Sequence, residues 1–298
     1  MRLGGPIRLC FIMLLPAAGC GRQANSVEPR DTALVQTMQA GGQALAMGRP
    51  KQAIDQYRQA YTLALARNDV HAIGDCGYNL AVVQLANNDA LEALHTVART
   101  RDALSIRASP GFPELDLVEA SALFRLGRLS DADRVAQRAQ DAATDPATLA
   151  RASYVRGLVA EARGDPVAMA LALHAFGQPT APSPSWEADH AELQGRLELL
   201  HGHYAQAAIL AEQAAAIQRT QLNYHAMAEA LAVAAKAQQS AGDVQAAADL
   251  YLQAGESAAA RDDTASAERW LRSAAGPGAS MSTRRTAQDA LAAIHKAQ

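Results

Sequence analysis

A short turn segment that recurs at nearly constant spacing constrains the fold of this chain more than any other feature. It occurs six times, as GRPKQAI from Gly48, NDALEAL from Asn88, GRLSDAD from Gly127, GDPVAMA from Gly164, GHYAQAA from Gly202 and GDVQAAA from Gly242. The steps between them are 40, 39, 37, 38 and 40 residues. Glycine permits the left-handed cap at a helix end, and the proline or polar residue after it starts another helix. Each segment therefore predicts a turn between two helices, and the chain predicts a row of helical hairpins.

Small residues recur at fixed distances from these turns. Seven positions before the turn stand Gly41, Ala81, Ala120, Gly157, Gly195 and Ala235; five positions after it stand Ala53, Ala93, Ala132, Met169, Ala207 and Ala247; twelve positions after it stand Ala60, Thr100, Ala139, Phe176, Ala214 and Ala254. This pattern resembles the tetratricopeptide (TPR) repeat over residues 33–261. The resemblance implies an all-α, right-handed superhelical solenoid of helix-turn-helix repeats. The units are longer than the usual ~34 residues, and the family's tryptophan, tyrosine and proline positions are mostly absent.

The composition agrees with an all-α fold. Hydrophobic residues make up 49% of the chain but aromatic residues only 4%, and alanine dominates, which favours close-packed helices over sheets. We expect six pairs of helices, at 33–47 with 50–67, 70–87 with 89–106, 113–126 with 129–143, 147–163 with 165–176, 185–201 with 204–221, and 224–241 with 243–260. In the segment 262–298 we expect a partial repeat at 263–274 and a capping helix at 283–296, because each repeat buries its apolar face only on its neighbours.

Two interruptions fall between the expected helices. They are SPGFP at 109–113 and the proline-rich GQPTAPSPS at 177–185, and prolines do not continue a helix. The second interruption predicts either a hinge between the fourth and fifth repeats or a long surface loop without functional weight.

The first twenty residues, MRLGGPIRLCFIMLLPAAGC, have the architecture of a secretory signal. The apolar stretch from Leu9 to Ala18 is about half the ~20 residues that a helix needs to cross a bilayer, so a permanent transmembrane anchor is the weaker interpretation. The last four residues, ending at Cys20, resemble the lipobox of bacterial lipoproteins. That resemblance implies a signal peptide at 1–19 and lipid, including palmitate, on Cys20. Cleavage by an ordinary signal peptidase is the alternative, because Ala17 stands where leucine is commonest.

The location follows from the same resemblance. Residues 20–32 would form a flexible tether, and Gly21 stands where aspartate is linked to retention in the inner membrane. We therefore expect a chain anchored by its lipid in the bacterial cell envelope, at the outer membrane and facing the periplasm.

Lipidation also accounts for the cysteines. Cys10 is lost with the signal and Cys20 is acylated, which leaves Cys76 without a partner, so no disulfide framework is implied. We expect Cys76 to be a small buried residue. Without lipidation, a bridge between Cys20 and Cys76 is the alternative.

Charge and motifs narrow the function classes. The net charge is −3, without the basic surface that nucleic acid requires. The sequence contains no nucleophile elbow, phosphate-binding glycine loop or zinc-helix motif, so it predicts neither an enzyme nor a cofactor. The nearest candidate metal site is His201 and His203, with Glu198 or Tyr204 nearby. We expect the two histidines to diverge around the cap at Gly202, and no metal is assigned.

Four titratable residues cluster on the helix that opens the fifth repeat, namely Glu187, Asp189, His190 and Glu192. General acid–base chemistry would need a pocket and an opposing partner, so the cluster is interpreted as a solvated helix face.

The TPR resemblance implies that the first helices of the hairpins line a concave binding surface. The corresponding positions are Asp75, Tyr78, Asn79, Glu114, Ser121, Arg151, Tyr154, Asp189, Glu192, Arg196, Glu229 and Lys236. Tyr78 and Tyr154 would serve as rigid anchors for a partner, and Arg151 and Arg196 would bind its carboxylates. Any one of these residues is equally well explained as part of a solvated face. Only three lysines occur in the chain, which argues against the basic groove that holds chaperone tails.

These observations predict an envelope-anchored scaffold that binds other envelope proteins or peptides. A soluble periplasmic regulator that senses a ligand or peptide is the alternative. An enzyme with an unrecognised site is the least expected reading.

Overall fold

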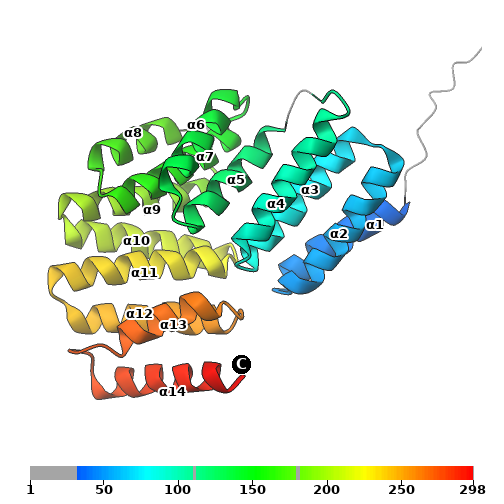
Figure 1. Ribbon diagram of the computed structural model, residues 1–298. Helices are drawn as coiled ribbons and strands as arrows, with labels where there is room; N and C mark the ends of the chain where they lie inside the picture. Colours follow the sequence, from blue (N-terminus) through cyan, green and yellow to red (C-terminus); the bar gives the residue numbers. More distant parts are fainter. Residues whose placement is uncertain (1–31, 110–111, 179–181, 298) are drawn as a thin grey trace, which may run out of the picture. The chain divides into compact units, whose positions relative to one another are not determined.

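The computed structural model describes residues 32–109, 112–178 and 182–297. The expected signal peptide, the lipid-bearing Cys20 and the tether up to residue 31 lie outside the described residues. Over the described residues the fold is all-α, without a β-strand (Figure 1). The helices are α1 Thr32–Ala46, α2 Pro50–Arg67, α3 Val70–Ala86, α4 Ala90–Ser105, α5 Pro113–Arg125, α6 Leu129–Ala142, α7 Pro146–Arg163, α8 Pro166–Phe176, α9 Pro184–His201, α10 Tyr204–Thr220, α11 Tyr224–Ala241, α12 Val244–Ala259, α13 Thr264–Ala274 and α14 Met281–Ala297.

Each helix packs on the next one along the chain, as Figure 1 shows for α9 to α12. We call the first helix of each hairpin its A helix (α1, α3, α5, α7, α9, α11) and the second its B helix. Neighbouring A helices also touch, as in the pairs α5–α7, α7–α9 and α9–α11. This packing confirms the predicted solenoid of TPR-like helical hairpins. Every expected helix is present, with its ends within two residues of the expected positions.

The turns have the expected chemistry. Gly202 and Gly242 adopt the left-handed conformation, with φ of 80° and 90°, and their N–H groups donate to carbonyls of the preceding turn. Asp165 and Asp243 then accept hydrogen bonds from the first turn of the following helix, which stabilises a helix by about 1 kcal/mol. These short connections place each B helix directly against its A helix.

All eighteen residues of the three small-residue columns are buried. The approach is closest where glycine stands, because a Cβ atom on Gly195 would lie 3.2 Å from the carbonyl oxygen of Ala207. The fourth hairpin departs from the pattern with Met169 and Phe176, which are also buried and pack with Leu193 of α9. The columns are therefore the contact line between helices, filled by larger side chains where α8 is short.

Aromatic rings fill the junction between α8 and α9. Phe176 lies 5.4 Å from Trp186 between ring centroids, and Trp186 stacks on His190 at 4.7 Å. Because residues 179–181 of the connecting loop lie outside the described residues, the hinge stays a prediction.

A contact far apart in the sequence ties the second hairpin to the start of α13. The amide of Asn88, in the turn between α3 and α4, donates to Asp263 Oδ1 at 2.8 Å. Asp263 is the N-cap of α13 and also accepts from the backbone N–H of Ser266. Two turns that are 175 residues apart therefore lie against each other.

Cys76 is buried as predicted, at 1% exposure, with its Sγ 3.4 Å from Met38 Sδ. Burial raises the pKa of this thiol to about 12, so it stays protonated and unreactive near neutral pH. Among the described residues, no helix combines the length and the apolar character needed to cross a membrane.

Candidate binding surface on the A helices

Five polar side chains on three consecutive A helices form a continuous chain of hydrogen bonds and ion pairs. They are Tyr154 and Glu161 of α7, Glu192 and Arg196 of α9, and Lys236 of α11. Spacings of four and seven residues keep both members of a pair on the same face of their helix. We call this set the A-helix charge ladder.

The ladder runs from one helix to the next through shared carboxylates. The hydroxyl of Tyr154 donates to Glu192 Oε1 at 2.9 Å, and Arg196 Nε donates to the same oxygen at 2.9 Å. Another nitrogen of Arg196 donates to Glu161 Oε2, and Lys236 Nζ donates to Glu161 Oε1 at 3.0 Å. Each carboxylate thus binds two donor residues. Arg196 neutralises carboxylates on its own helix and on α7, and Lys236 of α11 neutralises Glu161 on α7, two A helices away.

Burial makes these contacts strong. Glu192 is 1% exposed, and the side chains of Arg196 and Glu161 are 11% and 12% exposed. Burial opposes the charge on Arg196, but Glu192 and Glu161 outweigh it and hold the guanidinium pKa well above its ordinary value. Burial also opposes the charge on Glu161, yet Arg196 and Lys236 keep the pKa of that carboxyl below its ordinary value. Both groups therefore stay charged at neutral pH.

Two carboxylates beside the ladder have pKa values that are raised mainly by burial. Asp189 accepts a hydrogen bond from Gln218 Nε2 at 3.1 Å, and burial together with the charge of Glu192 raises its pKa to about 7. Glu229 lies 3.8 Å from Arg269, and burial raises its pKa as well. Both side chains are half-buried on the A-helix face of α9 and α11, so a cation brought by a ligand would be attracted to them.

The structure brings together six of the predicted groove residues. Tyr154, Asp189, Glu192, Arg196, Glu229 and Lys236 belong to the ladder or lie beside it. The expectation of a solvated face is wrong for Glu192, because the side of α9 that carries it packs against α7. Arg196 and Tyr154 are likewise bonded within the chain, so they do not present free groups to a partner.

The remaining predicted residues lie apart from the ladder. Asp75 pairs with His71 at 2.9 Å, and Asn79 donates to the carbonyl of Asp75 at 2.8 Å. Tyr78 is partly buried and packs against the core cluster of the first five helices, and Glu114 is half-buried at the start of α5. The hydroxyl of Ser121 donates to the carbonyl of Leu117, one turn earlier in the same helix.

Arg151 differs from the other predicted residues because it is exposed on α7. Among the described residues it has no ion pair or hydrogen bond through its guanidinium, and it acts on Asp189 and Asp145 only through its charge. Lys236 is also exposed, but it is paired with Glu161, so Arg151 is the predicted groove cation without a partner among the described residues.

Sequence reasoning missed Glu161 and Gln218. Glu161 lies three residues before the turn, which is not one of the positions used to predict the groove. Gln218 belongs to the B helix α10. A signal for Glu161 exists, since it follows Tyr154 by seven residues and therefore lies on the same face of α7.

A second charged cluster lines a cavity of about 500 Å³ between α4, α5 and α6. Asp116 accepts hydrogen bonds from Arg101 and, at 2.8 Å, from Arg138, and Glu119 pairs with both arginines. Phe112 supplies an apolar wall. The volume suits a small molecule, but the cavity lies away from the A-helix charge ladder.

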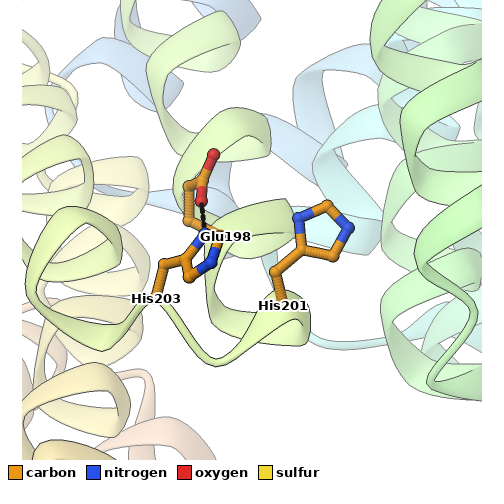
Figure 2. Close-up of side chains that lie close together, drawn as sticks. All are labelled: Glu198, His201 and His203. Atoms are coloured by element: carbon orange, nitrogen blue, oxygen red, sulfur yellow. Dashed lines mark hydrogen bonds and ion pairs between the residues drawn. The ribbon is translucent and has the colours of Figure 1, made fainter.

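The fifth turn gathers two histidines and a carboxylate. Figure 2 shows Glu198 and His203 joined by a hydrogen bond, with the ring of His201 beside them. His203 Nδ1 lies 2.6 Å from Glu198 Oε2, and the two imidazole centroids are 5.9 Å apart. One possible ligand atom from each of the three residues lies within 4.8 Å of the others. The expectation that the histidines diverge is therefore wrong.

Neither a protein-family model nor a curated protein matches the chain. Solved structures resemble it at low identity. A crystal structure of a tetratricopeptide repeat protein from Parabacteroides merdae is 15% identical with a TM-score of 0.46, and the match covers 88% of this chain and 99% of that one. The TPR2AB domain of yeast Sti1, in complex with pHSP90, is 15% identical with a TM-score of 0.37, covering 89% and 98%. The assignment to helical hairpins rests on the packing of this chain's own helices.

Proposed function

We propose that this protein is an envelope-anchored, non-catalytic adaptor that binds a segment of another protein across the A helices α7, α9 and α11. The observation that carries the proposal is the pair of half-buried carboxylates, Asp189 and Glu229, beside the A-helix charge ladder. Three A helices contribute to one connected network, and the half-buried Asp189 and Glu229 beside it have pKa values raised mainly by burial. A surface of that kind is pre-organised, so a partner would pay little conformational entropy on the adaptor side.

The same surface indicates the chemistry of the partner. A lysine or arginine placed between the α9 and α11 carboxylates would neutralise them and would lower the pKa that burial has raised. Arg151, which is exposed on α7, would repel such a cation or bind an adjacent carboxylate. The preferred partner segment therefore carries a basic residue, with an acidic residue toward α7.

Site-specific photo-crosslinking in the native host tests the binding surface. A photoreactive residue at position 151, on the A-helix face, should capture a protein that a residue at position 170, exposed on the B helix α8, does not. Combining position 151 with Asp189→Asn and Glu229→Gln should reduce capture at least about tenfold, because the carboxylate charges are removed while the shapes are kept. Equal capture from positions 151 and 170, or capture that ignores both carboxylates, would refute the proposal.

The anchor is a separate part of the proposal and has a separate test. The lipobox-like ending at Cys20 supports it. Cells fed labelled palmitate should label the wild-type chain and the Cys76→Ala variant, but not Cys20→Ala, and only the first two should fractionate with membranes. If Cys20→Ala keeps the label or its membrane fraction, the lipid anchor at this residue is refuted.

The cavity at α4–α6 favours a second candidate, a soluble periplasmic regulator that binds a small ligand. Its volume of about 500 Å³ and its paired charges beside the Phe112 ring suit a small polar molecule with an apolar part. This candidate predicts ligand binding that is lost in Arg138→Gln and unaffected by Asp189→Asn, which separates it from the adaptor.

A further inference from the structure

We propose that Glu198, His201 and His203 form a binding site for a divalent metal ion of the zinc class at the turn between α9 and α10. Two imidazole nitrogens and one carboxylate oxygen are ligands that zinc prefers. Three protein ligands leave a fourth position of a tetrahedral ion for water or for a ligand from a partner.

The backbone of the turn, not chance side-chain placement, brings the three residues together. Gly202 adopts φ 80°, and the N–H of His203 donates to the carbonyl of Glu198 at 2.9 Å. This cap folds residue 203 back over the last turn of α9, where Glu198 and His201 lie. His203 then begins α10, since its carbonyl accepts from the N–H of Ala207 at 3.0 Å. Both ends of the turn are thus fixed by helices.

The side chains need only small rotations to bind an ion. At zinc–ligand distances of about 2.0–2.2 Å, ligand atoms lie roughly 3.4 Å apart around a tetrahedral centre, and here they already lie within 4.8 Å of one another. The ring of His203 is 67% exposed and that of His201 is also exposed, so neither is held by packing. The Glu198 side chain is only 22% exposed, which holds the carboxylate in place for both rings.

The fifth turn differs from other histidine–carboxylate pairs in the number of possible ligand groups it brings together. His71 pairs with Asp75, His95 with Glu92, and these exposed pairs each contain one imidazole. Among the described residues, the fifth turn alone combines three such groups within reach of a single ion. The five equivalent turns have no histidine beside the glycine or asparagine. An ordinary surface ion pair would explain the 2.6 Å contact of His203 with Glu198. It would not explain why His201 lies close to both.

Zinc titration of the untagged full chain tests the site. By isothermal titration calorimetry, His201→Gln and His203→Gln should each weaken the binding of one equivalent of Zn²⁺ at least about tenfold. The matched control is His95→Gln, which removes an exposed histidine beside Glu92 and should leave the isotherm unchanged. Cysteine thiols are common to all variants, so they do not affect the comparison. Identical isotherms for the wild type, His201→Gln and His203→Gln would overturn the proposal.

The sixth turn offers a gain-of-function test. Its cap has the same backbone, with Gly242 at φ 90° and the N–H of Asp243 donating to the carbonyl of Gln238 at 3.0 Å. The triple substitution Gln238→Glu, Ala241→His and Asp243→His reproduces the three residues there and should add a second equivalent of bound Zn²⁺. A triple variant that keeps its helical circular dichroism but binds no additional zinc would overturn the claim that this turn assembles a site.

Discussion

Replacing Arg196 by methionine should destabilise the middle of the solenoid by about 3 kcal/mol. Methionine matches the length of the aliphatic part of arginine, so the change removes the guanidinium with little loss of packing. Arg196 binds both Glu192 and Glu161. Lys236 still neutralises Glu161 in the variant, from 3.0 Å. Glu192, at 1% exposure, keeps only the hydroxyl of Tyr154.

The magnitude follows from that single uncompensated charge. Removing one partner of a buried ion pair costs about 3–5 kcal/mol because the other charge is left without a partner. The surviving hydrogen bond from Tyr154 to Glu192 and the surviving pair at Glu161 place Arg196→Met at the lower end of this range. Adding Glu192→Gln removes the buried charge and leaves a carbonyl oxygen for Tyr154. The double variant should therefore regain roughly half of the loss.

Native-state hydrogen exchange is the appropriate assay, because a repeat array need not unfold in one step. A loss of about 3 kcal/mol should speed exchange of the protected amides of α9 about a hundredfold, since 1.4 kcal/mol corresponds to a factor of ten. Amides of α2, in the first hairpin, provide the internal reference and should change far less.

Two results would refute this reasoning. Wild-type exchange in α9 of Arg196→Met would show that the ladder contributes no net stability. Equal losses in Arg196→Met and in the double variant with Glu192→Gln would show that lost packing, not an unpaired charge, destabilises the helix.

Three further changes test other parts of the structure. Since the Asp189 pKa is raised from 3.8 to about 7, folding favours its protonated form, and the wild type should lose stability as pH rises from about 4 to about 7. Asp189→Asn should not show this loss, as guanidinium denaturation at several pH values would reveal. Ala132→Leu should cost about 1–3 kcal/mol by overpacking a fully buried position, measured as a lower Tm, whereas Ala142→Leu on the exposed face of α6 should not. Asn88→Gly keeps the left-handed backbone but removes the 2.8 Å bond to Asp263, and should speed hydrogen exchange in the first turn of α13 only.

The helices and their order could be predicted from the sequence because their signals are local. A glycine or asparagine at each turn and a small residue seven positions earlier are short-range features, and both correspond to observed caps and buried contacts. The positions of the groove residues followed from the same register. For that reason six of them lie together on α7, α9 and α11.

The pairing and burial of those residues could not be predicted in the same way. Whether Glu192 is buried, and whether Arg196 meets Glu161, depends on how closely α7 approaches α9, and the spacing along one helix does not contain that distance. The approach of His203 to Glu198 in the fifth turn could not be predicted from spacing either. A separation of two residues suggests divergence, but the left-handed cap at Gly202 folds His203 back toward Glu198.

The close approach of α7 and α9 has a cause in the fourth hairpin. Gly157 of α7 leaves space that Leu193 of α9 fills, because a Cβ atom at position 157 would lie 2.6 Å from Leu193 Cδ2. Arg196 follows Leu193 by three residues and Glu161 follows Gly157 by four, so each lies one helical turn beyond the contact. A glycine that permits tight apolar packing thereby sets the distance at which the two charged side chains meet. The same packing explains why this hairpin departs from the small-residue columns. It also explains where the A-helix charge ladder lies.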